Sequence, residues 1–124
     1  MAIVVLGYAG CDLEPFEVDG VPSGKVKMLR NLYVNEQHRR QGYARALLTH
    51  IAAKADAEQY AIMLEPRSDE IELDVLLSMY AEHGFVELQA DPLLLVRFPA
   101  EPDINLAPKK TTIAILNAAG VPFN

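Results

Sequence analysis

The chain has 124 residues, of which 51% are hydrophobic and 23% are charged, a balance typical of one globular domain. Its formal net charge of −6 argues against a protein whose main partner is a nucleic-acid backbone. The one cysteine, Cys11, excludes an internal disulfide and a cysteine-rich metal site. No apolar stretch approaches the roughly 20 residues of a membrane span, and no leader peptide is evident. We therefore expect a soluble, cytoplasmic protein.

The first half of the chain predicts two strands and a helix. Residues 2–8 are apolar and β-branched, which is typical of a strand. Residues 9–24 contain three glycines and two prolines, so we expect them to be irregular, with no more than a short strand near residues 16–18. Apolar side chains on both faces of residues 25–34 predict a strand that is partly buried on both sides. The helical spacing of apolar residues predicts a helix over residues 42–58.

The second half continues the alternation. Its predicted elements are a buried strand over 60–65, a helix over 71–83, strands over 85–88 and 93–98, and a short helix over 111–119. Helices between strands imply a parallel pair, whereas the closing hairpin is antiparallel. We therefore expect an α/β fold of the mixed α+β type, with a mixed central sheet flanked by helices. We expect the chain to comprise a domain over residues 1–99, followed over residues 100–124 by a proline-containing linker and a C-terminal helical tail.

The start of the first long helix predicts an anion site. The N–H groups of a first helical turn have no internal acceptors and the helix dipole makes the position mildly positive, so such places bind phosphate. Gly42 lets a ligand approach the backbone, and the small Ala44 keeps that side open. Arg39 and Arg40 can reach phosphate oxygens. The spacing favours a diphosphate cradle, and an ordinary loop with a solvated basic face is the alternative.

The segments LYVNEQHRRQGYARALLTHI and MYAEHGF resemble two motifs of the GNAT superfamily of N-acetyltransferases, whose helix-start pattern is Q/R-x-x-G-x-G/A. The resemblance covers about residues 28–98 and implies the acyl-CoA N-acyltransferase fold, with acetyl-CoA as the cosubstrate. It implies that the pyrophosphate binds to Arg39, Arg40, Gln41, Gly42, Tyr43 and Ala44. It also implies that the pantetheine arm meets the main chain of Leu32, Tyr33 and Val34.

The same resemblance suggests the catalytic groups. Tyr80 stands where the family commonly has the acid that protonates the departing CoA thiolate, and its alternative role is that of a core aromatic. A main-chain N–H near Val34 is expected to polarise the thioester carbonyl. Many relatives have a glutamate as a base where this chain has Met28, so Glu65, at the end of the next strand, is the candidate base. Glu65 is alternatively a strand-end carboxylate facing solvent or an arginine, and no base is needed if the amine arrives neutral.

Two further departures concern the acceptor side. Leu73 replaces an asparagine that often holds the cofactor arm. The resemblance also makes this a short member of the family, because only about 25 loop-rich residues precede the main strand. The acceptor side is then either open, which suits a macromolecule or a loosely held amine, or closed by a second subunit in a homodimer. The tail is another candidate cover, because a core that is already complete does not need Ile113 and its apolar neighbours.

These observations predict an N-acetyltransferase that moves an acetyl group from acetyl-CoA to a primary amine by direct transfer in a ternary complex. The acceptor is a small-molecule or a protein amine, with no nucleic-acid or membrane partner. No metal is expected, because His38, His50 and His83 lack the spacing of a metal site. The alternative is a catalytically inactive CoA-binding or protein-interaction module with the same fold.

Overall fold

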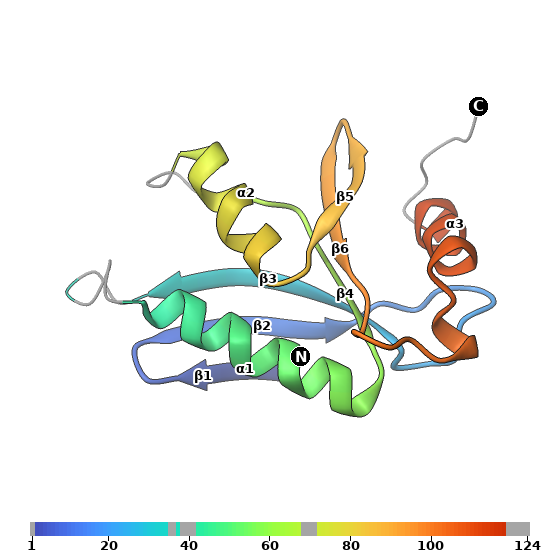
Figure 1. Ribbon diagram of the computed structural model, residues 1–124, viewed down its shortest axis with the longest axis horizontal. Coiled ribbons are helices and arrows are strands. Elements are labelled where there is room, and N and C mark those ends of the chain that lie inside the picture. Colours follow the sequence, from blue (N-terminus) through green and yellow to red (C-terminus); the bar gives the residue numbers. More distant parts are fainter. Residues whose placement is uncertain (1, 35–36, 38–41, 68–71, 119–124) are drawn as a thin grey trace.

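The computed structural model describes residues 2–34, 37, 42–67 and 72–118 of the chain (Figure 1). Its strands are β1 Ala2–Leu6, β2 Ala9–Pro15, β3 Val26–Val34, β4 Ala61–Leu64, β5 Val86–Ala90 and β6 Leu93–Arg97. Its helices are α1 Tyr43–Glu58, α2 Leu73–Glu82 and α3 Pro108–Ala118, with a short 3₁₀ turn, η2, at Ile104–Leu106. The strands form one sheet in the order β1-β2-β3-β4-β6-β5. Only β3 and β4 pair in parallel among these neighbours, so the predicted mixed α/β fold is confirmed.

The hairpin of β1 and β2 corrects the expectation that residues 9–24 are irregular. Gly10 belongs to β2 because the ring of Tyr33 lies over it, and a Cβ at Gly10 would stand only 2.6 Å from the Tyr33 hydroxyl oxygen. Pro15 is the last residue of the strand, where a missing N–H does little harm. Residues 16–18, where a short strand was expected, lie outside the strands. Gly10 and Pro15, which usually interrupt strands, are therefore both accommodated within β2.

Two smaller boundaries also differ from expectation. The last helix begins at Pro108, three residues before the predicted start, because the fixed φ of proline suits the first position of a helix. β5 extends to Ala90, which leaves Asp91 and Pro92 as the turn to β6.

The sheet is covered differently on its two faces. On one face, α1 and α2 bury a core that includes Leu47, Ile51 and Tyr80. On the other face, α3 and η2 cover the middle strands, with Leu106 and Ile115 fully buried against β4 and β6 (Figure 1). The expectation that the core is complete without the C-terminal segment is therefore wrong, because α3 supplies part of it. Within the described residues, no helix is both long and apolar enough to cross a membrane.

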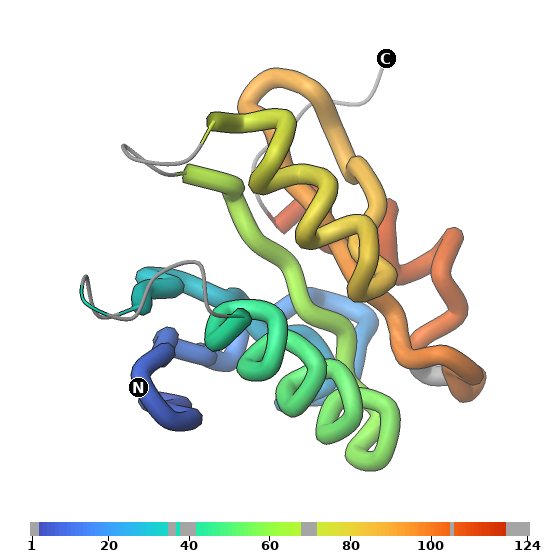
Figure 2. Tube along the Cα trace, turned by 60° about the vertical axis from the view of Figure 1, so that its left-hand side comes forward, coloured from blue at the N-terminus to red at the C-terminus, as the bar shows by residue number. Residues whose placement is uncertain are grey.

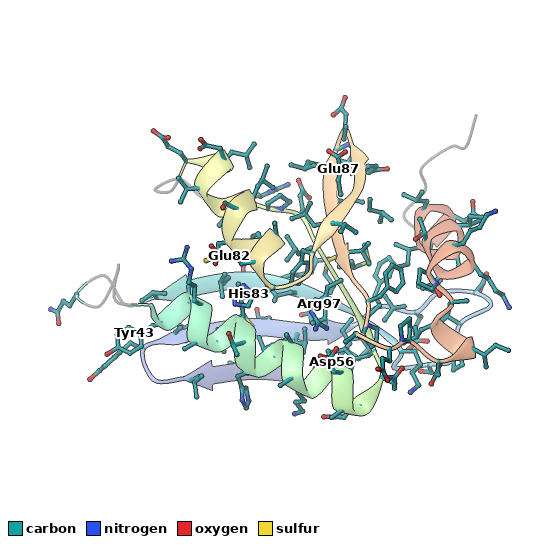
Figure 3. All side chains as sticks on the ribbon, viewed as in Figure 1. Tyr43, Asp56, Glu82, His83, Glu87 and Arg97 are labelled. Atoms are coloured by element: carbon teal, nitrogen blue, oxygen red, sulfur yellow. The ribbon has the colours of Figure 1, made fainter. Side chains whose placement is uncertain are left out.

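An ion pair between the buried Arg97 and the half-exposed Asp56 joins three elements near the start of β4. Arg97 is only 7% exposed, and its Nη2 lies 3.0 Å from Asp56 Oδ1 at the end of α1 (Figure 3). Its Nε donates a hydrogen bond of 2.7 Å to the main-chain oxygen of His83, just after α2. Asp56 also accepts a 2.9 Å bond from the N–H of Ala100. These bonds fix the ends of α1, α2 and β6 relative to one another.

Candidate active site

The parallel strands β3 and β4 pair at one end only. Their register runs from Val26 opposite Ala61 to Met28 opposite Met63. β3 then continues to Val34, whereas β4 ends at Leu64. Figure 2 shows the two strands diverging beyond the paired segment. A crevice between diverging strands at their carboxyl ends is a usual place for a ligand in an α/β sheet.

A cavity of about 420 Å³ occupies this crevice, within the range of small-molecule sites. It is lined by Met28, Leu29, Arg30, Asn31, Leu32, Leu64, Glu65, Arg67, Tyr80 and Leu94. The structure therefore brings together three residues that the sequence suggested from separate segments: Leu32, Glu65 and Tyr80. It does not bring the side chain of Tyr33 to them, because that ring lies over Gly10. Val34 packs its side chain against the core beneath α1.

A β-bulge in β3 forms part of the cavity wall. Between the pairs Gly10–Tyr33 and Asp12–Arg30, β3 has one residue more than β2, which bends the strand and redirects its side chains. Asn31 takes the left-handed conformation there, with φ of 56°. Its Nδ2 donates a 2.7 Å hydrogen bond to Asp12 Oδ2 on β2. Sequence reasoning missed this pair, and its one signal was an asparagine within an apolar strand, a residue that tolerates this conformation.

Tyr80 is a buried wall of the cavity, with 4% of its surface exposed. Its ring packs edge-on against Phe85, with centroids 5.5 Å apart. Burial, and to a lesser degree the nearby Cys11, raises the pKa of Tyr80 to about 12. The phenol therefore keeps its proton at neutral pH, so it can donate a hydrogen bond to a group that becomes negative in the cavity.

Hydrogen bonds of His83, three residues after Tyr80, hold α2 against α1. His83 Nδ1 lies 2.8 Å from the main-chain oxygen of Met79, so this nitrogen carries the proton. His83 Nε2, 3.2 Å from Thr49 Oγ1 on α1, then accepts a hydrogen bond from that hydroxyl. Arg45 on α1 also pairs with Glu82 on α2 at 2.9 Å, and their hydrogen bond raises the pKa of Arg45 and lowers that of Glu82. The contacts of Glu82 and His83 therefore join the end of α2, just after Tyr80, to α1.

The candidate base, Glu65, makes an ion pair at the rim of the cavity. Its Oε1 accepts hydrogen bonds from Nη2 of Arg67 at 2.8 Å and from Nε at 3.1 Å. Both side chains are exposed to solvent. This is the arrangement expected of a strand-end carboxylate that faces an arginine. Met28 also lines this cavity, and its thioether cannot accept a proton.

The start of α1 fits an anionic ligand. Gly42 precedes the helix with φ of 83°, and a Cβ built on it would meet nothing within 4 Å. The described part of the helix start has no side-chain cap, and its first turn contains no acidic residue. Tyr43 and Ala44 pack against the core, and the Tyr43 ring meets Tyr8 edge-on with centroids 5.1 Å apart. The other residues assigned to the cradle, Arg39, Arg40 and Gln41, lie outside the described residues, as does His38.

The described residues contain no cluster of three His, Cys, Asp or Glu side chains that would hold a metal ion. Leu73, at the start of α2, is 51% exposed. It does not line the cavity.

Comparison with protein families places these features in context. The family model of the acetyltransferase (GNAT) domain matches residues 2–87. The chain belongs to this family of acyltransferases, which use acetyl-CoA as the acyl donor for amine acceptors. The chain therefore has the domain that defines this class of enzymes, as the two sequence motifs predicted. Among curated proteins, no sequence matches the chain.

Solved structures share the fold at low sequence identity. The ribosomal-protein-S18-alanine N-acetyltransferase of Escherichia coli has a TM-score of 0.58 and 20% identity, over 80% of this chain and 66% of that enzyme. The anti-CRISPR protein AcrVA5 has a TM-score of 0.57 and 18% identity, over 77% of this chain and 95% of its own. N-acetylglutamate synthase of Neisseria gonorrhoeae, solved with coenzyme A and L-arginine, has a TM-score of 0.54 and 20% identity. That match covers 76% of this chain and 22% of the synthase.

Proposed function

We propose that this chain transfers the acetyl group of acetyl-CoA directly to a primary amine, with both substrates bound in a ternary complex. The observation that carries the proposal is the cavity at the splayed end of β3 and β4, where Leu32, Glu65 and the buried Tyr80 meet. Membership of the GNAT family supplies the reaction class. The acceptor is a small-molecule or a protein amine.

Acetyl-CoA supplies the thioester, and the chain supplies its binding sites. Gly42, Tyr43 and Ala44, together with Arg39, Arg40 and Gln41, would hold the diphosphate. Support comes from the uncapped helix start and from the open space around Gly42. The main chain of Leu32, Tyr33 and Val34 would meet the pantetheine arm, since β3 runs past the end of β4 there.

The role we assign to Tyr80 follows from its raised pKa. A phenol with a pKa of about 12 holds its proton more tightly than a thiol, whose ordinary pKa is about 8.5. Tyr80 therefore donates a hydrogen bond to the sulfur as negative charge develops, which lowers the barrier to its departure. The proton that converts the departed thiolate into the thiol then comes from water, and Tyr80 keeps its own proton.

Removal of a proton from the amine falls to Glu65 or to solvent. In our proposal Glu65 acts through a water molecule at the rim of the cavity, while Arg67 keeps it oriented through Oε1. An amine that arrives neutral needs no such base, and Glu65 then serves only to position Arg67. A Glu65→Gln variant separates these roles, because loss of the base lowers kcat most at low pH, where the free amine is scarce.

The second candidate is an inactive CoA-binding module with the same fold. It is favoured by Met28, which cannot accept a proton, and by the existing partner of Glu65. A first experiment asks whether acetyl-CoA raises the melting temperature of the chain. A second measures thiol release from acetyl-CoA with a panel of amines. Binding with release that falls in Tyr80→Phe supports the enzyme, whereas binding without release across the panel supports the inactive module.

Three further expectations belong to this proposal. The chain works in the cytoplasm, its residues 1–99 form the acetyltransferase unit to whose core the C-terminal segment adds α3, and it forms a homodimer. The first rests on the composition and the second on the sequence pattern. The third gains support from the uncharged edge strand β1.

A further inference from the structure

The two edges of the sheet differ in how well they are protected against pairing with another chain. At one edge, β5 carries the charge of Glu87 and has a shift of register between Glu87 and Gln89. Charges and bulges of this kind keep edge strands apart. At the other edge, β1 has the sequence AIVVL, without charge, proline or glycine, and it pairs with β2 without any shift. The margin formed by β1 is therefore a regular, uncharged strand (Figure 1).

The hairpin geometry shows which main-chain groups of β1 point outward. Residues 7–8 form a two-residue loop that is closed by the pair of Leu6 and Ala9. In such a hairpin the closing pair exchanges both of its hydrogen bonds, and so does every second pair beyond it. Counting back from Leu6, the even-numbered residues of β1 bond to β2. The N–H and C=O groups of Ile3 and Val5 consequently point to the open edge.

The side chains of the same two residues form an apolar strip. Ile3 is 65% exposed and Val5 is 59% exposed. Between them, Val4 packs on the core beneath α1, so Ile3 and Val5 lie on the opposite face of the sheet. The core between the sheet and α3 lies on that face, and none of its described residues comes from β1. On the described structure, both the main chain and the side chains of this strand are available to a partner.

We propose that β1 pairs antiparallel with β1 of a second copy of this chain, around a two-fold axis at Val4. In this register Ile3 lies opposite Val5 of the second copy, and the outward main-chain groups of both residues become hydrogen-bonded. The two apolar strips then become cross-strand neighbours, which adds to the stability of the pair. A two-fold contact of this kind closes on itself, so it produces a dimer and not a fibre. The inference is independent of the acetyl transfer proposed above.

Charge favours a second copy over a foreign peptide. The chain carries a net charge of −6, so two copies repel each other in most orientations. Contact between two β1 strands places only uncharged side chains on the two central strands. The nearest carboxylate, that of Asp12 opposite Ile3 on β2, is already hydrogen-bonded to Asn31. An uncharged strand also has no charged group by which to select a foreign sequence. The same strand in a second copy presents the matching β-branched residues in register.

The mass of the 124-residue chain in solution tests the proposal. Sedimentation velocity at several concentrations is expected to give the mass of two chains for the wild type. Val5→Lys is expected to raise the dissociation constant at least 10-fold and to give a monomer, because it places an ammonium group against Ile3 of the second copy. Val86→Lys is the matched control, since Val86 is 58% exposed on the opposite edge strand, and it should leave the mass unchanged. A monomeric wild type, or a dimer that survives Val5→Lys and dissociates with Val86→Lys, overturns the proposal.

A cross-linking experiment tests the register and does not depend on a charged substitution. The native Cys11 is buried, and burial raises its pKa to about 11, so it is expected to resist oxidation. In the proposed register position 4 faces its own symmetry mate, so Val4→Cys should form a disulfide-linked dimer under mild oxidation. Position 3 lies two residues from its mate along the strand and one strand spacing across, which together separate the two Cα atoms by about 8 Å, more than the roughly 7 Å that a disulfide spans. Ile3→Cys should therefore stay unlinked, and the reverse result overturns the pairing.

Discussion

The paired and the splayed ends of the β3–β4 pair contain similar residues in different surroundings. Tyr60 stands at the paired end and Tyr80 at the splayed end, and burial raises the pKa of both to about 12. Only Tyr80 lines the cavity. Tyr60 lies beneath the ammonium group of Lys27, 4.1 Å from the ring centroid, and its hydroxyl has no partner among the described residues. A raised pKa therefore reports burial at both ends, and it indicates function only where the strands separate.

A glycine and an arginine at the paired end can likewise be compared with a glycine and an arginine at the splayed end. Gly24, before β3, and Gly42, before α1, have φ of 82° and 83°, and both have open space where a Cβ would stand. Near the paired end, Arg97 is buried against Asp56, whereas at the splayed end Arg67 is exposed against Glu65. The comparison suggests that residues near the paired end stabilise the fold and that their counterparts at the splayed end bind or react. Matched substitutions test this division.

The largest effect is expected from the two tyrosines. Tyr80→Phe should lower kcat by about 100-fold, since removal of one donor to a developing charge costs at least that much in known sites. Tyr60→Phe should leave kcat unchanged and should not reduce stability, because it removes a buried hydroxyl without a partner. Steady-state thiol release and urea unfolding measure the two quantities. Equal losses of kcat in the two variants would show that burial, and not position, explains the effect of Tyr80.

The arginines should show the opposite dependence. Arg97→Met is expected to lower the free energy of unfolding by about 2–4 kcal/mol, because it leaves Asp56 without its guanidinium partner and frees the His83 carbonyl. Arg67→Met should change stability by less than about 0.5 kcal/mol, as exposed ion pairs usually do. Urea denaturation of both variants checks the difference. A stability loss in Arg67→Met as large as that in Arg97→Met would contradict the division between the two ends.

The two glycines distinguish backbone strain from ligand contact. Gly42→Val and Gly24→Val should lower the melting temperature by similar amounts, because each forces a side chain into a left-handed conformation that costs about 1–2 kcal/mol. Only Gly42→Val should also weaken acetyl-CoA binding, by about 10-fold or more, through its Cβ near the diphosphate. Isothermal calorimetry measures the affinities. If Gly42→Val bound acetyl-CoA with wild-type affinity, the diphosphate would not bind at this helix start.

The bulge in β3 should show a smaller effect that is specific to the site. Asn31→Gly keeps the left-handed conformation and removes the hydrogen bond to Asp12, at a cost of about 1 kcal/mol. We expect a rise in KM for acetyl-CoA or a fall in kcat of less than about 10-fold. Asn117→Gly, an exposed change near the end of α3, is the control for a general loss of stability. Identical kinetics in Asn31→Gly and the wild type would limit the Asp12–Asn31 pair to a structural role.

Alkaline titration should give the most gradual change. The pKa values of Tyr60 and Tyr80, about 12 in the folded chain, exceed the ordinary value of about 10. The unfolded chain therefore loses these protons first, so stability that is present below pH 10 declines as the pH rises from 10 to 12. Cys11, raised to about 11, adds a decline that begins near pH 9. In each Phe variant, the urea concentration at the unfolding midpoint should fall less steeply with pH between 10 and 12. An unchanged slope would show that the pKa of the replaced tyrosine is not raised in the folded chain.

Most elements could be predicted from local patterns, and so could the class of protein. The helical spacing from residue 43 onward, the buried run AIML and the stop at Gly84 predicted α1, β4 and α2 correctly. The two motifs around Gly42 and Tyr80 also predicted the family that the domain match shows. These features depend on residues that are close in sequence, where side-chain spacing and backbone preference act directly.

The tertiary structure decided the features that depend on distant residues. β2 is a strand because Tyr33 covers Gly10 and β1 and β3 pair on its two sides. α3 belongs to the core because η2 and the middle strands meet it there. The bulge in β3 brings the side chain of Asn31 to Asp12 on the adjacent strand, 19 residues away in sequence.

The sequence by itself determined where the helices and most strands lie, and that a glycine-containing helix start and a tyrosine–glycine motif occur in one chain. Only the tertiary structure decided that β3 and β4 separate after Met28 and that Leu32, Glu65 and Tyr80 share one cavity. The physical reason is that local propensity acts over a few residues, whereas strand pairing, burial and cavity formation depend on which distant segments meet.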